Sequence, residues 1–423
     1  MNRFGIILLT AVFILFQAEY ISASDRFSIS GYYKSYFTAL DRPEVEDLKQ
    51  TQDQPIIGAV NNRLRMKLFG TINDWMSVNL AYDFSSRVQD RSLFEKQFLD
   101  LGFTPRGYRA KDLDSQLYPG SDDSVSSLAI FQNLDRLYLT INGKWADLYL
   151  GRQAIAWGSA HLINPTDILV PYAFNQLDVE DRTGVDAFRI RIPAGLMGEI
   201  DAGYVFGEDL KYKNSALFLR GRFYYHRTDI TAMGIVFQKN LLFGLDLARS
   251  LGGAGFWLEG GYVLANALDS QRHNDEEDYL RISIGMDYVL ADGTYLFGEY
   301  HFNQAGACEP ENHLSLLEKT AYRQGSVYLF GRHYLVPGIS YQITPLFILN
   351  GEMLINLTDP SVFLMPQVEY NIAQDIYLSA GAYFGLGEKP DAVTYDDQKT
   401  TVKLRSEFGG YPDLYFTSFR IYF

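Results

Sequence analysis

Basic side chains alternate with apolar ones along one stretch of the sequence, a pattern that could place cations in a wet pore. Arg63, Arg65 and Lys67 occupy every second position, and a leucine or methionine follows each of them. A period of two is typical of a β-strand with one polar and one apolar face. A cation that faces lipid costs about 2–4 kcal/mol at the membrane midplane. The basic face of a membrane-spanning strand must therefore face water.

Lys34 belongs to the strand predicted before this one, and it completes what we call the basic patch. The basic patch consists of Lys34, Arg63, Arg65 and Lys67. On the strand predicted next, the positions facing it are small or polar and include one carboxylate, Asp83. Cations without partners attract anions, so the basic patch is predicted to line a pore and to favour anions. The alternative is that loop carboxylates such as Asp90, Glu95 or Asp100 fold in and neutralise it.

A second set of charges has partners of opposite sign on neighbouring predicted strands. This charge ladder consists of Arg189, Arg191, Glu199, Asp201, Arg220 and Arg222. Opposite charges that face each other across strands stabilise the pair. The charge ladder is therefore predicted to line the interior as structural ion pairs and not to select solutes.

A third motif begins with Gly-Arg-Gln at 151–153 and continues through Asn-Pro-Thr-Asp at 164–167 to Pro171. The prolines stiffen a segment that cannot continue strand pairing. The motif resembles a segment of porin-like and alginate-export-like outer-membrane barrels, in which a strand ending in Gly-Arg-Gln runs into a structured loop. This resemblance implies a loop folded inward that narrows a pore and presents Arg152 and Asp167. The alternative is a rigid outer loop that only braces the wall.

Residues that could support catalysis or metal binding gather only around position 310. His313 and Ser315 have the His-x-Ser spacing of outer-membrane phospholipase, but they lie in a predicted acidic loop and not on a strand. Cys308, Glu309 and Glu311 together with His313 match no closed zinc pattern. We therefore expect no enzymatic activity, no metal and no cofactor.

The first residues have the order of an export signal. Arg3 precedes an apolar run over 5–16 that is too short to span a bilayer, and small residues follow at 22–23. We predict a cleaved signal peptide over 1–23 and a single domain over 24–423. The chain is 15% aromatic and has one cysteine, and no later run is long enough for a membrane helix. This profile predicts an all-β transmembrane barrel, located in the bacterial outer membrane.

Turn signals divide the chain into about eighteen antiparallel strands, with sixteen as the alternative. Short connections, predicted to be periplasmic turns, fall at 71–74, 142–147, 193–198, 226–229, 250–255, 291–293, 344–345 and 371–375. Longer connections, predicted to be outer loops, fall at 39–59, 87–127, 154–184, 207–215, 265–278, 305–325 and 386–410. Two further connections of this second set, at 238–240 and 358–360, are predicted to be short. Alternation of short turns and long loops is typical of outer-membrane barrels.

The last residues alternate in the same way and end on an aromatic residue. Tyr415, Phe419, Ile421 and Phe423 share one face. The pattern resembles the terminal-strand signal by which outer-membrane barrels are passed to their assembly machinery. It implies barrel-assembly machinery and periplasmic chaperones as partners, besides outer-membrane lipid.

These features favour a porin-like channel for passive diffusion of small hydrophilic solutes, with some preference for anions. An export barrel for an anionic polysaccharide or glycolipid would use the same basic interior. A non-conducting receptor or adhesin would place its function in the outer loops. The net charge of −14 argues against a nucleic-acid partner.

Deletion of Phe423, or its replacement by a charged residue, is expected to lower the amount of assembled barrel severalfold, because the predicted recognition signal ends on this ring. The measurement is the heat-modifiable fraction of the protein in isolated outer membranes. Phe416→Leu, on the opposite predicted face, serves as the control. Unchanged assembly without Phe423 would contradict the assignment.

Overall fold

The computed structural model describes residues 26–41, 56–91, 107–120, 127–269, 277–394 and 400–423. The predicted signal peptide over 1–23 lies outside these residues, as do Glu95 and Asp100.

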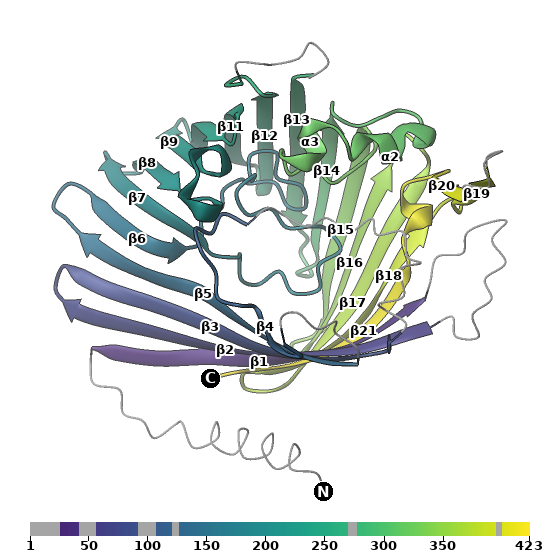
Figure 1. Cartoon of the computed structure of the whole chain (residues 1–423), viewed down its shortest axis with the longest axis horizontal. Helices are drawn as coiled ribbons and strands as arrows, with labels where there is room; N and C mark the ends of the chain where they lie inside the picture. The colour runs from purple at the N-terminus through teal and green to yellow at the C-terminus, as the bar shows by residue number, and fades with distance from the viewer. Residues whose placement is uncertain (1–25, 42–55, 92–106, 121–126, 270–276, 395–399) are drawn as a thin grey trace, which may run out of the picture.

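Eighteen long antiparallel strands close into a barrel (Figure 1). Each pairs with its neighbours in chain order, and β21 pairs with both β18 and β1. Their bounds are β1 Phe27–Asp41, β2 Ile56–Asn73, β3 Met76–Gln89, β5 Leu128–Asn142, β6 Asp147–Gln153, β7 Val185–Ala194, β8 Gly198–Val205, β9 Ala216–Tyr225, β10 Thr228–Phe237, β11 Asn240–Leu251, β12 Ala254–Leu264, β13 Tyr279–Val289, β14 Tyr295–Asn303, β15 His333–Thr344, β16 Phe347–Asn356, β17 Ser361–Ala373, β18 Ile376–Leu386 and β21 Asp413–Tyr422. Closure pairs the backbone groups that an open sheet would expose to lipid. The prediction of eighteen strands is confirmed.

The remaining elements are short and lie in the connections. The strand β4 (Gln116–Tyr118) pairs with β5, and β19 (Asp391–Thr394) forms a hairpin with β20 (Thr400–Lys403). The helices are η3 (Glu208–Leu210), η4 (Tyr212–Asn214), η5 (Pro310–Asn312), α2 (His313–Leu316), α3 (Thr320–Arg323) and η6 (Phe408–Gly410). No helix in the described ranges is long and apolar enough to cross a membrane.

Tight turns join the strands at one end of the barrel, and longer connections join most of them at the other, where only 238–239 and 357–360 are short. At the short-turn end the connections hold two to five residues. Gly252 and Gly253 form one of them, with φ angles of 60° and 93° that glycine adopts without strain. At the long-loop end the connections over 154–184 and 304–332 are the largest that the structure describes throughout. The predicted alternation of short turns and long loops is confirmed, together with its two short exceptions.

Side chains alternate between the outer surface of the barrel and its interior. On β2, Arg65 is 1% exposed inside the barrel, whereas Met66 next to it is 38% exposed outside. Trp75 and Trp145 are exposed at the short-turn end, where membrane barrels carry an aromatic girdle. An apolar outer surface and a polar inner wall follow from this period of two.

The last strand occupies the position that closes the barrel. Phe419 lies in register with Ser35 on β1 and with Leu378 on β18. The backbone of Phe423 exchanges two hydrogen bonds with Gly31, at 2.7 and 3.1 Å. The role of Tyr415, Phe419, Ile421 and Phe423 in assembly stays a prediction.

Apolar side chains fill the part of the interior nearest the long loops. One cluster joins Ile155, Ile168 and Val170 to side chains of β8 to β12. A second cluster places Phe174 among aromatic side chains of β15, β17, β18 and η6. Residues 154–184, which we call the inner loop, contribute to both clusters. Figure 1 shows this connection inside the ring of strands.

A buried carboxylate joins three connections at the long-loop end. Glu407 accepts hydrogen bonds from the backbone N–H of Phe330 at 2.9 Å, from Asn356 Nδ2 at 2.8 Å and from the Tyr334 hydroxyl. Its own N–H donates to Asp359. No described cation forms an ion pair with it. Burial raises the pKa of Glu407 to about 7.

We expect the long-loop end to be more stable at pH 5 than at pH 8. The pKa of Glu407 is about 7 in the folded protein and 4.5 ordinarily, so between these values the folded state binds more protons than the unfolded chain. Stability therefore falls as pH rises through this window and then levels off. Protection factors for amide exchange at Phe330 measure this change in stability. Glu407→Gln should reduce the pH dependence, and the part that is left belongs to Asp359, whose pKa burial also raises. Protection that rises with pH would contradict the account.

Candidate functional site

The inner loop runs around the inside of the wall before it returns to β7. Residues 160–166 form hydrogen bonds with β12, β13 and β14. Phe174 then packs against Phe363 of β17, with ring centroids 4.9 Å apart. Asp178 reaches Lys34 of β1, and the backbone at position 184 bonds to β5. The loop therefore narrows the interior on several sides, and it lies inside the barrel as the resemblance implied.

Glu259 of β12 holds the first half of the inner loop. Its carboxylate accepts the N–H of Ala160 at 3.1 Å and the N–H of Thr166 at 2.9 Å, and the Thr166 hydroxyl donates to it at 2.6 Å. Glu259 is fully buried and has no ion pair with the described residues. A buried carboxylate is costly unless it is hydrogen-bonded. Here the loop supplies the donors that a cation would otherwise supply.

Glu299 of β14 holds the same turn of the loop. Its Oε2 accepts the N–H of His161 at 2.7 Å and Trp257 Nε1–H at 2.9 Å, and its Oε1 accepts the N–H of Ile163 at 3.2 Å. From β13, Arg281 donates to the carbonyl oxygen of residue 165 at 2.7 Å. The buried turn lies outside the sheet, so wall side chains satisfy its backbone polar groups.

The basic patch is paired, which corrects the prediction that its cations lack partners. Its partners include three inner-loop residues that we call the acidic segment: Asp178, Glu180 and Asp181. Lys34 Nζ lies 2.7 Å from Asp178 and 2.6 Å from Glu180. Arg63 Nη1 lies 3.0 Å from Asp178, and Lys67 Nζ lies 3.3 Å from Asp181. The inner loop thus neutralises the patch. The alternative stated from the sequence named carboxylates of another loop, such as Asp90.

Arg65 and Lys34 are the most enclosed members of the patch, each at 1% exposure. It pairs with Asp83 at 3.1 Å and with Asp135 in close contact, and Asp181 lies 3.5 Å away. Burial alone would raise the pKa of Asp181, but Arg65 and Lys67 hold that pKa below its ordinary value. Two wall carboxylates and the acidic segment together balance the cations of the patch.

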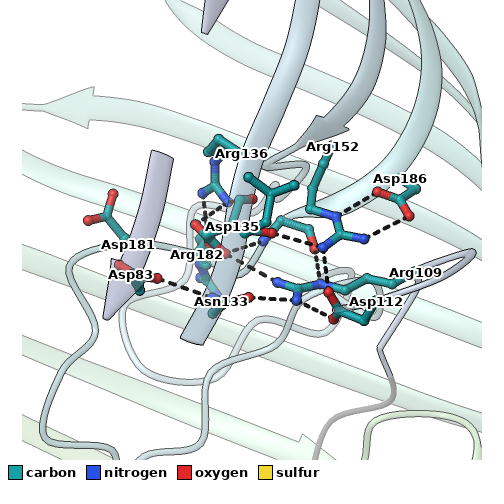
Figure 2. Close-up of polar contacts among 12 residues, drawn as sticks. Asp83, Arg109, Asp112, Asn133, Asp135, Arg136, Arg152, Asp181, Arg182 and Asp186 are labelled. Carbon is teal, nitrogen blue, oxygen red and sulfur yellow. Dashed lines mark hydrogen bonds and ion pairs between the residues drawn. The ribbon is translucent and has the colours of Figure 1, made fainter. Parts of the chain in front are cut away.

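Arg152 is not presented to the interior space, contrary to the prediction. It is 6% exposed, and its Nε and Nη2 bond to Asp186 at 2.7 and 3.1 Å. Its Nη1 bonds to Asp112 at 2.7 Å, and Arg109 bonds to the same carboxylate at 2.6 Å (Figure 2). Burial would raise the pKa of Asp112, but hydrogen bonds from both arginines lower it. Arg152 therefore ties the segment before β4 to the wall, which is why it is unavailable to a solute.

Asp167 is also enclosed, at 2% exposure. It forms an ion pair with Arg182 at 2.8 Å. The Arg182 guanidinium lies 3.7 Å from the centroid of the Tyr172 ring and donates to the carbonyl of Val170 at 2.8 Å. The ion pair joins the first and second halves of the inner loop. Asp167 is therefore paired with Arg182 and is not presented to a pore, contrary to the prediction.

The charge ladder lies on β7, β8 and β9. Arg189 pairs with Asp201 at 2.6 Å, Arg191 contacts Glu199, and Arg220 lies 3.4 Å from Glu199. Arg222 is in register with Glu199. The predicted cross-strand pairs are present, and their contribution to stability stays a prediction.

A cavity of about 270 Å³ lies between the inner loop and strands β16 to β18. Its lining includes Tyr172, Gln176, Val179, Arg182, Asn350, Glu352, Gln367 and Tyr383. The volume is just below the roughly 300–1,000 Å³ typical of small-molecule sites. Sequence reasoning missed the wall residues, because each is a single polar residue in an ordinary alternating strand.

The residues around position 310 form no site of recognisable chemistry. Ser315 Oγ donates to the carbonyl of Asn312 at 2.7 Å, and not to His313. His313 is buried, with Asp359 3.9 Å away, and Cys308 is exposed. In the part of the chain that the structure describes, no three His, Cys, Asp or Glu residues are grouped to hold a metal ion.

Replacement of Glu299 by glutamine is expected to loosen the inner loop, because the new NH₂ group would face N–H donors. Each lost hydrogen bond to the carboxylate is worth about 1.5–3 kcal/mol. The unfolding temperature in detergent should fall. Asp229→Asn, at an exposed wall carboxylate that has no ion pair among the described residues, is the control. Equal unfolding temperatures for Glu299→Gln and the wild type would contradict the anchoring role.

No family model and no curated protein matches the chain. Among solved structures, it is similar to Acinetobacter baumannii OccAB2, with 8% identity, a TM-score of 0.55, and coverage of 94% of this chain and 98% of that chain. It is also similar to Acinetobacter baumannii OccAB1, with 10% identity, a TM-score of 0.54, and coverage of 94% of this chain and 96% of that chain. A third similar structure is Pseudomonas aeruginosa OpdK with vanillate, with 9% identity, a TM-score of 0.52, and coverage of 94% of this chain and 98% of that chain. Together with the closed barrel, these likenesses show that the chain has the fold of the porins of the bacterial outer membrane.

Proposed function

We propose that the chain is an outer-membrane channel for passive diffusion of small hydrophilic solutes. The observation that carries this proposal is the inner loop, which Glu259 and Glu299 fix inside a closed barrel beside a polar cavity. An eighteen-stranded barrel is wide enough for an aqueous lumen unless loops fill it. A fixed loop that narrows such a lumen sets the size of the solutes that pass.

The surroundings of the barrel support the same proposal. The apolar outer surface, with Trp75 and Trp145 at one end, suits outer-membrane lipid as the partner. Barrel-assembly machinery and periplasmic chaperones stay predicted partners, and the absence of enzymatic activity stays a prediction.

The ion preference of the channel depends on the acidic segment. The anion preference expected from the sequence requires free cations, whereas the acidic segment neutralises the basic patch. Exposed ion pairs are weak and are screened by salt. Of the patch, Lys67 and Arg63 are the most exposed side chains, at 37% and 25%. We infer that any attraction for anions is small and arises at these two residues.

The narrowed interior also bears on the alternatives. An export barrel for a polysaccharide or glycolipid needs a wide path, but apolar clusters around Ile168 and Phe174 occupy the interior near the long loops. This arrangement favours small solutes over a polymer. A non-conducting receptor or adhesin would not require a polar cavity beside the inner loop.

Reconstituted protein should conduct ions in planar bilayers. Replacing Asp178, Glu180 and Asp181 with the corresponding amides should shift the reversal potential in a salt gradient toward anions, because the basic patch then loses its loop partners. Asp209→Asn, on an exposed carboxylate of another loop, is the control. Absence of conductance would contradict the proposed channel. An unchanged reversal potential in the triple variant would contradict the role given to the acidic segment.

A further inference from the structure

Several polar groups with no partner meet in the cavity beside the inner loop. Among the described residues, the side chains of Gln176, Asn350, Glu352 and Gln367 have no hydrogen bond or ion pair. Asn350 and Gln367 lie in register on β16 and β17, and Glu352 follows two positions after Asn350 on the same face. The buried Oδ1 atom of Asn164, which also lines the cavity, has no partner either. The four side chains are half-buried and converge on one cavity. A cavity in which a few polar groups converge is typical of a ligand site.

The charges around this cavity leave one carboxylate uncompensated. Asp167 lies 2.8 Å from Arg182, and burial raises the pKa of Asp167 to about 7 in spite of that cation. Burial lowers the pKa of His161, so its ring is neutral at pH 7. Glu352 is therefore the one carboxylate of the described lining with no cation beside it.

We propose that Glu352 is a specificity-determining residue of the channel, and that it binds the ammonium group of a small hydrophilic solute. The proposal rests on the proposed channel and names the class of solute that this cavity favours. The carboxylate supplies the opposite charge, as acidic rings do in cation-selective pores. The side-chain oxygens of Gln176, Asn350 and Gln367 can accept the N–H and O–H groups of the same solute.

Aromatic rings complete the site. Tyr383, Tyr328 and Phe174 line the cavity, and each is largely buried. Ring faces attract an ammonium group within about 6 Å of their centroids. A cation is therefore favoured over a neutral solute of the same shape, and an anion is disfavoured by Glu352.

Efflux from proteoliposomes tests this with three probes that share a six-carbon hydroxylated chain: protonated N-methylglucamine, sorbitol and gluconate. Each is present at tracer concentration in KCl at pH 7, so potassium and chloride balance any charge that moves. N-methylglucamine should leave about fourfold faster than sorbitol, the ratio expected for one unit charge acting over about 5 Å in water. Gluconate should leave more slowly than sorbitol.

Variants at Glu352 decide the outcome. Glu352→Gln should bring the N-methylglucamine rate down to that of sorbitol, whereas Glu352→Asp should keep the difference. Asp229→Asn removes a wall charge outside the cavity and should leave all three rates unchanged. Equal rates for N-methylglucamine and sorbitol in a wild-type channel that conducts KCl would overturn the role of Glu352 but not the proposed channel. A preference for N-methylglucamine that survives Glu352→Gln would do the same. A wild-type protein without KCl conductance would overturn the proposed channel and this inference with it.

Discussion

Two wall carboxylates that accept the backbone N–H groups of the inner loop determine the rest of the interior. Glu259 and Glu299 lie on strands of a barrel, where no described cation pairs with them. The loop needs acceptors for its buried N–H groups, and the carboxylates need donors. The hydrogen bonds between the loop N–H groups and the two carboxylates meet both requirements. Once residues 160–166 are fixed in this way, the second limb of the loop passes β17 and reaches the basic patch on β1 and β2.

The path of the loop in turn distributes the charges of the interior. At the basic patch the loop brings carboxylates, so cations that the strands leave unpaired become neutral ion pairs. Beside β16 to β18 the loop brings Gln176 and the Asp167–Arg182 pair, and Glu352 stays without a partner. Which charge remains free is therefore set by the loop and not by the strand that carries it.

Strand number, turn positions and the two faces of each strand could be predicted, because they follow from local periodicity. The charge ladder could also be predicted, because Arg189 and Asp201 lie on strands adjacent in the sequence. The partners of the basic patch could not. Lys34 and Asp178 are 144 positions apart, and no strand pattern shows where a long connection returns to the wall. The partner of Arg152 could not be predicted for the same reason. Asp112 belongs to a connection between strands, and periodicity does not show the path of a connection.

The central claim is that the inner loop, held inside the barrel, lines the route that solutes take. Val179 is 48% exposed and lines the cavity, so it offers a direct test. The native thiol at Cys308 is exposed and is first replaced by serine. In that background, single-channel current through Val179→Cys should fall in one step per channel when a charged methanethiosulfonate reagent is added. A current that the reagent leaves unchanged, with modification of the thiol verified by mass spectrometry, would contradict the account.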